Sequence, residues 1–264
     1  MTEWHAEEYH RESGLQQAMA QEQLGRLALA GGERILDVGC GDGKVTAEIA
    51  ARVPRGSVLG VDPSRDMVQF ASSRFGPPAH VNLRFEAGDA ARLPYREEFD
   101  LVVSFNALHW VIGQAAALAG IRASLRPGGR ALLRFVPNGP RKCLEEVVEE
   151  VRRRPRWAEH FADFETPYVH FLPEEYRALA EQAGLQVTRL QVDDKAWDFG
   201  SRDGFMGFSR ATLVNWTDRL PEQDCDAFIV DVLDAYQAVA SDSPSEANTF
   251  KFYQMEVELT AAPR

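Results

Sequence analysis

Short apolar runs alternate with helically spaced apolar positions through the first half of the chain. Runs rich in β-branched residues, which predict strands, cover 34–38, 57–61, 82–86, 99–104 and 130–135. Between the first two runs, Val45, Ile49 and Val53 recur at helical spacing, and similar patterns precede the later runs. This alternation is typical of βαβ units. It predicts a doubly wound α/β fold with a mostly parallel sheet.

Different patterns flank this core. Residues 14–29 carry Leu15, Met19 and Leu24 on a helical stripe, which predicts a helix that covers the sheet. Downstream, helices are expected over 141–153, from 173 onward, and over 202–240 with an interruption at Pro221; strands are expected over 185–192 and 249–260.

No repeat or linker divides the 264 residues, so we expect a single domain over 1–264. Within it we expect a helical lid over 1–30, a cofactor-binding core over 31–136, and substrate-cap helices with closing strands over 137–264. The oligomeric state is left open by the sequence.

Composition narrows the class of protein. The chain is 45% hydrophobic and 26% charged, and no apolar run approaches the ~20 residues that span a bilayer. The N-terminus lacks the basic and apolar segments of a signal peptide, so a cytoplasmic location without membrane contact is expected. A net charge of −11 disfavours a nucleic-acid partner, because such binding needs cationic surface. We therefore expect no nucleic-acid partner.

The three cysteines, Cys40, Cys143 and Cys225, are widely spaced and contain no Cys-x-x-Cys pair. This pattern argues against a disulfide framework and against a zinc site. We therefore expect reduced thiols and no metal.

A glycine-rich turn follows the first predicted strand. Gly39, Gly41 and Gly43 form G-x-G-x-G, whereas the dinucleotide-binding pattern G-x-G-x-x-G would need glycine at Lys44. Such a turn lets the backbone approach a ligand at a helix N-terminus. Asp37, ahead of the turn, favours a ligand with a positive group, such as the ammonium of S-adenosylmethionine.

Two more carboxylates follow the next strands in order. Asp62 ends the second strand, where it can accept hydrogen bonds from both ribose hydroxyls of a nucleoside. Asp89 follows the third strand. There its carboxylate can accept a hydrogen bond from the adenine amino group, while the amide of Ala90 donates a hydrogen bond to an adenine ring nitrogen. Any one of these carboxylates could be a solvated turn residue or a helix cap. Together they favour a nucleoside-containing cofactor.

These segments, with 99–104 and 125–129, resemble the successive motifs of class I S-adenosylmethionine-dependent methyltransferases over about residues 30–136. The resemblance implies S-adenosyl-L-methionine as cofactor and a seven-stranded, Rossmann-like sheet whose last strand, 249–260, is antiparallel. The expected cofactor-binding residues are Asp37, Gly39, Cys40, Gly41, Asp62, Pro63, Met67, Asp89, Ala90 and Asn106.

A narrower resemblance concerns the acceptor. Leu108-His109-Trp110 and the N-terminal stretch 9–16 are similar to small-molecule carboxyl methyltransferases, including trans-aconitate and juvenile hormone acid methyltransferases, and the N-terminal stretch also resembles malonyl-carrier-protein methyltransferases. In the juvenile hormone acid enzymes, the residues that match Gln16 and Trp110 hold the substrate carboxylate. Tyr9, Lys195 and Trp197 are further candidates for substrate contacts, the last two in a stretch expected to follow a strand.

Chemistry separates the possible acceptors. A carboxylate, with a pKa near ~4, is ionised at neutral pH and needs positioning rather than a general base. A phenol, amine or carbon acid would need a base, and His109 is well placed to supply it. We therefore name His109, Trp110 and Gln16 as candidate catalytic residues. Carboxyl O-methylation is the first hypothesis, methylation at N, C or a phenol the second, and a non-catalytic cofactor-binding module the third.

Overall fold

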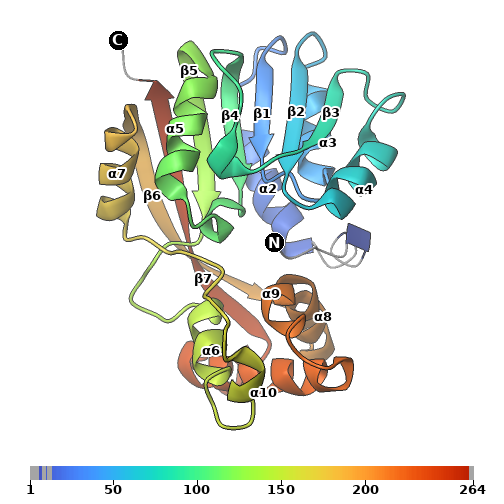
Figure 1. Cartoon of the computed structure of the whole chain (residues 1–264), viewed down its shortest axis with the longest axis vertical. Helices are drawn as coiled ribbons and strands as arrows, with labels where there is room; N and C mark the ends of the chain where they lie inside the picture. Colours follow the sequence, from blue (N-terminus) through green and yellow to red (C-terminus); the bar gives the residue numbers. More distant parts are fainter. Residues whose placement is uncertain (1–5, 8–9, 11–13, 262–264) are drawn as a thin grey trace.

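A seven-stranded sheet with strand order β3-β2-β1-β4-β5-β7-β6 organises the computed structural model, which describes residues 6–7, 10 and 14–261 (Figure 1). Strands β1 to β5 run parallel, and β7 pairs antiparallel with both β5 and β6. The predicted fold class is therefore confirmed, including the antiparallel last strand. The strands are β1 (Arg34–Val38), β2 (Ser57–Asp62), β3 (Leu83–Ala87), β4 (Phe99–Phe105), β5 (Leu125–Phe135), β6 (Leu185–Asp198) and β7 (Thr249–Ala261).

Helices cover both faces of this sheet. One face packs against α2 (Gly14–Arg26), α3 (Lys44–Arg52) and α4 (Arg65–Phe75), which bury Leu24, Ile49 and Ala71 in a shared core. The other face packs against α5 (Gln114–Ser124) and α7 (Pro173–Gln182), which bury Ile121 and Tyr176. Helical spacing of these apolar positions is what lets each helix present one stripe to the sheet.

Two predicted boundaries shift for identifiable reasons. The strand expected to end at Val192 continues as β6 to Asp198, because β7 pairs with it along its whole length, from Leu185 with Ala261 to Asp198 with Thr249. The helix expected over 141–153 is α6 (Leu144–Val151). Its start is set by a capping box, in which the Glu146 amide donates to Cys143 Sγ and the Cys143 amide donates to the Glu146 carboxylate.

The cap is a separate helical layer at one end of the sheet, around the protruding ends of β6 and β7 (Figure 1). It contains α6, α8 (Arg202–Thr212), α9 (Val214–Thr217) and α10 (Glu222–Ala240). Their buried aromatic side chains, including Phe205, Trp216 and Phe228, form one core with Phe250 and Phe252 of β7. Among the described residues, no helix is long and apolar enough to cross a bilayer.

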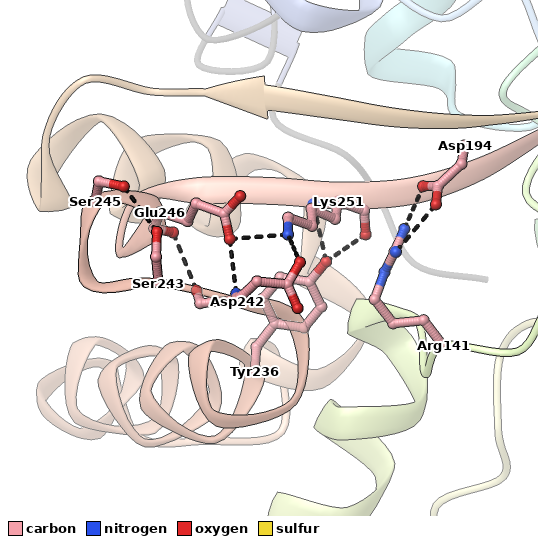
Figure 2. Close-up of polar contacts among 9 residues, drawn as sticks. Arg141, Asp194, Tyr236, Asp242, Ser243, Ser245, Glu246 and Lys251 are labelled. Atoms are coloured by element: carbon pink, nitrogen blue, oxygen red, sulfur yellow. Dashed lines mark hydrogen bonds and ion pairs between the residues drawn. The ribbon is translucent and has the colours of Figure 1, made fainter.

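Polar contacts fasten this layer to the two long strands (Figure 2). Arg141, just before α6, donates two hydrogen bonds to the carboxylate of Asp194 on β6. The hydroxyl of Tyr236 on α10 accepts from the Lys251 amide of β7 at 3.1 Å and also donates to the Lys251 carbonyl. The Lys251 ammonium binds the carboxylates of Asp242 and Glu246 at 2.6 and 2.8 Å. These contacts join the segments around α6 and α10 directly to β6 and β7.

Within the cap, Glu149 of α6 is buried, with 5% of its surface exposed, and its carboxylate accepts hydrogen bonds from several cap segments. We call this group of contacts the Glu149 hub. The Glu149 carboxylate accepts hydrogen bonds from Arg152 and Arg153, from the Thr166 hydroxyl at 3.0 Å and from the Trp216 indole at 2.9 Å. Burial raises the pKa of Glu149, but the donors, led by Arg152, outweigh it and hold the pKa below its ordinary value. The ionised carboxylate thus joins three segments of the cap.

We predict that Glu149→Ala lowers the free energy of unfolding by about 3 kcal/mol at pH 7, because it leaves the buried Arg152 without its partner. Since the pKa of Glu149 is depressed in the folded state, its contribution is present above the ordinary carboxyl pKa and is lost as the pH falls through the folded value. Urea unfolding at pH 7 and in acid measures both effects. The neighbouring Glu150→Ala is the control, because Glu150 is exposed and pairs only with Lys142; an equal loss in both variants would contradict the hub.

Candidate functional site

A cavity of about 720 Å³ lies at the carboxyl ends of β1, β2 and β4. This is the edge where open α/β sheets bind ligands, and the volume is in the range of cofactor pockets. We call it the main cavity. Nine residues predicted for the site line it: Gly39, Gly41, Asp62, Pro63, Met67, Asp89, Ala90, Asn106 and Trp110.

The glycine turn shapes the floor of this cavity because side chains do not fit there. Gly39 has a φ of +78°, and a Cβ at this position would lie 2.1 Å from the Cβ of Ala107 in the loop after β4. Gly43 has a φ of +79°, and a Cβ there would lie 2.6 Å from the Cβ of Ala71. Both glycines are therefore needed for backbone conformation and for close packing.

Asp62 places a carboxylate at the end of β2, on the wall of the cavity. Its two oxygens accept hydrogen bonds from the amides of Gly41 and Ser64, each at 3.0 Å. These bonds fix the carboxylate and tie the glycine turn to β2. A carboxylate can accept about four hydrogen bonds, which suits this residue type to the two hydroxyls of a ribose.

Asp89 and Ala90 form the wall beyond β3. The Asp89 carboxylate accepts from the Ala91 amide at 2.8 Å and so caps a short 3₁₀ helix, η1 (Ala90–Arg92). This cap is the structural role that the sequence left open for Asp89. The residue nonetheless lines the main cavity, as does Ala90.

Asp37 and Cys40 lie beneath the turn and are not part of the lining of the main cavity. Asp37 accepts a hydrogen bond from the Thr46 hydroxyl at 2.7 Å. Burial raises the pKa of Asp37 to about 7 against the effect of Thr46, and the charge of Asp62 adds to the rise. Burial also raises the pKa of the Cys40 thiol. In this geometry both residues support the turn from below.

A second hollow of about 80 Å³, the inner cavity, lies between the sheet, α2 and the cap. Its lining is mostly apolar, with His109 and Glu145 as the titratable side chains among the described residues. Asn106 and Trp110 line both this cavity and the main cavity. The two residues therefore form the boundary between the two spaces. The apolar lining consists of Leu15, Met19, Val136, Leu144, Phe208, Leu213, Phe250 and Phe252.

Asn106 is held in a defined orientation at this boundary. It has a φ of +57°, a left-handed conformation that asparagine tolerates. Its Oδ1 accepts a hydrogen bond from Nε2 of the buried Gln254 on β7 at 2.8 Å. With Oδ1 engaged, the Asn106 amide nitrogen is the atom that can donate to a ligand.

His109 borders the inner cavity but not the main cavity. Its ring lies 4.9 Å from that of Trp110 and 6.0 Å from that of His170, between centroids. Burial, with the charge of His170, holds the pKa of His109 well below its ordinary value, so the imidazole is neutral at pH 7. Its Nδ1 is buried and has no partner among the described residues.

Of the other substrate candidates, the structure describes Lys195 and Trp197, and neither lines this boundary. Tyr9 lies outside the described residues, and so does the side chain of Gln16, whose neighbours Leu15 and Met19 line the inner cavity. Lys195 and Trp197 lie within β6, not after it, and line a third hollow beside α2, where Lys195 binds Glu22. The sheet register places them there, beyond β7 from the cofactor strands.

Sequence reasoning missed most of the cap residues that close the main cavity. Asn215, Asp218 and Arg219 lie at α9 and just beyond it, and Glu165 and Pro167 lie in the loop before α7. For Glu165 and Pro167, the sequence pattern that could have indicated them is the aromatic stretch 157–172, which also includes the lining residue Phe164. Nothing local marks the α9 residues, because they reach the cavity only through tertiary packing.

Comparison with known proteins identifies the class of enzyme. Residues 35–129 match the family model of a methyltransferase domain. Trans-aconitate 2-methyltransferase from Deinococcus radiodurans is 36% identical over 94% of this chain and 95% of its own length. The chain belongs to the class I S-adenosylmethionine-dependent methyltransferases. It is an enzyme with S-adenosylmethionine as its cofactor.

Further comparisons give one more curated relative and two solved structures with the same fold. Juvenile hormone acid O-methyltransferase from Bombyx mori is 31% identical over 61% of this chain and 59% of its own length. The YcgJ protein from Bacillus subtilis has the same fold, with a TM-score of 0.69 at 20% identity over 94% of this methyltransferase and all of that chain. A phosphoethanolamine N-methyltransferase from Haemonchus contortus, solved with S-adenosyl-L-methionine, has a TM-score of 0.64 at 15% identity over 98% of this methyltransferase and 57% of that chain.

We predict that Asp62→Ala weakens S-adenosylmethionine binding at least about 100-fold, since two hydrogen bonds to a charged group contribute roughly 1.5–3 kcal/mol each. Trp110→Ala should leave cofactor affinity nearly unchanged, because Trp110 lies at the boundary with the inner cavity. Isothermal titration calorimetry measures both, with circular dichroism to confirm folding. Tight binding by folded Asp62→Ala would remove Asp62 from the cofactor site.

Proposed function

We propose that this methyltransferase O-methylates the carboxylate of a small organic or fatty-acid-like molecule. The observation that carries the proposal is the chemistry of the boundary between the two cavities. Asn106 and Trp110 form it, and their amide and indole nitrogens are hydrogen-bond donors, not bases. A carboxylate is an acceptor that is already ionised at neutral pH, so donors and no base are what its methylation needs.

In the proposed mechanism, the main cavity holds the cofactor. The Asp62 carboxylate would accept hydrogen bonds from the ribose hydroxyls, the Asp89 carboxylate and the Ala90 amide would bind the adenine, and the glycine turn would hold the methionine moiety. S-adenosylmethionine supplies an electrophilic methyl group on a sulfonium. Asn106 and Trp110 orient one carboxylate oxygen of the acceptor for in-line attack, together with Gln16 from the lid helix. The apolar wall of the inner cavity excludes water from the nucleophile.

The charges that line the cavities favour an acid with one carboxylate and an apolar body. In the described lining of the inner cavity there is no cationic side chain, and Glu145 there would repel a second carboxylate. In the main cavity Arg219 is the single described cation, and Asp218 and Glu165 accompany it. The trans-aconitate and juvenile hormone acid relatives both carry carboxylic acids in their names, which supports the reaction class. Of the two, the lining resembles a site for the more apolar kind of acid.

We predict methyl transfer from labelled S-adenosylmethionine to medium-chain monocarboxylic acids, with kcat/KM at least about tenfold above that for trans-aconitate, because desolvating an unpaired second carboxylate costs more than 1.4 kcal/mol. Mild base should release the label as methanol, as it does from an ester. Primary alcohols of equal length are the matched controls. Label that resists mild base, or faster transfer to the tricarboxylate, would contradict the proposed acceptor.

A second candidate is methylation of an amine, phenol or carbon acid with His109 as general base. The observation in its favour is that His109 is neutral at pH 7 and lines the inner cavity next to Trp110. Because burial holds the pKa of His109 well below its ordinary value, titration of His109 would not show in a pH profile near neutrality. Substitution is therefore the discriminating test.

For a carboxylate acceptor we expect His109→Asn to keep kcat within about tenfold of wild type, because no proton is removed in the step. A general base would contribute about 10²–10⁴-fold, and a loss of that size would favour the second candidate. Steady-state kinetics with the best acceptor of the panel measures the effect. A matched cofactor Kd in the two proteins shows that the site remains assembled.

We further propose that the substrate is a small molecule in the cytoplasm and not a nucleic acid. The net charge of −11 supports this, since a phosphate backbone would be repelled by the surface on average. Turnover of S-adenosylmethionine with any acid of the panel would support a small-molecule acceptor.

A further inference from the structure

Behind the inner cavity, three metal-binding side chains converge that the sequence did not connect. Cys143 and Glu145 lie at the start of α6, and His170 lies in the extended segment before α7, 27 residues after Cys143. One ligand atom of each residue lies within 4.8 Å of those of the others. Cys143 and Glu145 are buried. The sequence predicted no zinc site because a site of this kind has no Cys-x-x-Cys signature.

The distance between two of these atoms fits a shared metal ion. Cys143 Sγ lies 3.5 Å from His170 Nδ1. In a tetrahedral zinc site, Zn–S of about 2.3 Å and Zn–N of about 2.0–2.1 Å place the sulfur and nitrogen about 3.6 Å apart. A direct thiol–imidazole hydrogen bond has a similar length, so this distance alone does not distinguish it from a shared metal ion. The surroundings of the third residue, Glu145, favour the metal ion.

The Glu145 carboxylate is buried without a cation. Among the described residues none forms an ion pair with it, and the nearest basic residues in sequence are engaged elsewhere, Arg141 with Asp194 and Lys142 with Glu150. A buried carboxylate without a counter-charge is costly, and a bound cation would remove that cost.

We propose that Cys143, Glu145 and His170 bind a zinc ion. A thiolate, an imidazole and a carboxylate together suit zinc rather than magnesium or calcium, which prefer all-oxygen sites. Zinc binding displaces the proton of the Cys143 thiol to solvent, and the neutral His170 binds through a ring nitrogen. Three protein ligands leave a fourth position for water or another small ligand.

The position of this site gives it a consequence for the inner cavity. Glu145 lines that cavity together with His109 and Trp110. A zinc ion bound there would offset the charge of Glu145, the one carboxylate in the described lining, so the repulsion of a second substrate carboxylate proposed above applies to the zinc-free protein. Zinc binding can nevertheless be tested apart from the proposed acceptor, because metal content and cobalt spectra are measured without methyl transfer.

The first test is metal content and spectroscopy of the full-length protein. After dialysis with zinc and then without it, the wild type should retain about one zinc per chain by mass spectrometry of the metal. Cobalt(II) in place of zinc should give a thiolate charge-transfer band in the near ultraviolet and visible bands typical of tetrahedral coordination. Absence of zinc and of the thiolate band would overturn the proposal and leave a thiol–imidazole hydrogen bond.

Three variants and a matched control locate the ion. Cys143→Ser keeps an N-cap oxygen for α6, so it should fold while it loses the cobalt band. His170→Gln and Glu145→Gln should each weaken zinc affinity at least about tenfold, and added zinc should raise Tm in the wild type more than in these variants. Cys225→Ser, a cysteine that bonds only to backbone carbonyls, should retain the band and the zinc. Zinc that persists in Cys143→Ser, or is lost from Cys225→Ser, would overturn the assignment.

Discussion

The close approach of two loops, made possible by the missing side chain at Gly39, is the constraint on which the site depends. The loops after β1 and β4 meet so closely that even a methyl group at Gly39 would overlap Ala107. The same turn presents the Gly41 amide to Asp62 at the end of β2. One glycine-rich segment thereby joins three strands at their carboxyl ends. The main cavity exists because this junction leaves backbone, not side chains, on its floor.

A second set of buried polar contacts positions the acceptor side of the site. Arg134 of β5, with 1% exposure, donates to the Met19 carbonyl at 2.6 Å and to Glu22, which also binds Lys195. These contacts hold α2 over the sheet, while the Glu149 hub holds the cap together on the other side. The inner cavity lies between these two anchored layers. Its apolar lining is thus a product of packing between segments that are far apart in the chain.

Much of the core could be predicted from the sequence because its signals are local. A strand followed by glycines, or by Asp62 or Asp89, is readable in one segment, and the parallel sheet brings the ends of such strands to one edge. The helical spacing of apolar residues likewise predicted α3, α4 and α5 from single segments of the chain. The sequence was less informative where pairing overrides local pattern. Lys195 and Trp197 were expected beyond a strand, yet β7 draws them into β6 and away from the main cavity.

The sequence by itself determined the fold class and the cofactor, because both depend on short motifs that directly follow parallel strands, and the carboxyl ends of such strands meet at one edge of the sheet. Only the tertiary structure decided which side chains line which space. It placed Asp37 beneath the turn, made Asn106 and Trp110 the boundary of two cavities, and brought His170 to within 3.5 Å of Cys143. The residues in these contacts come from different segments and belong to no shared helical or strand pattern. They arise when helices and strands pack, and no local pattern in the sequence specifies that packing.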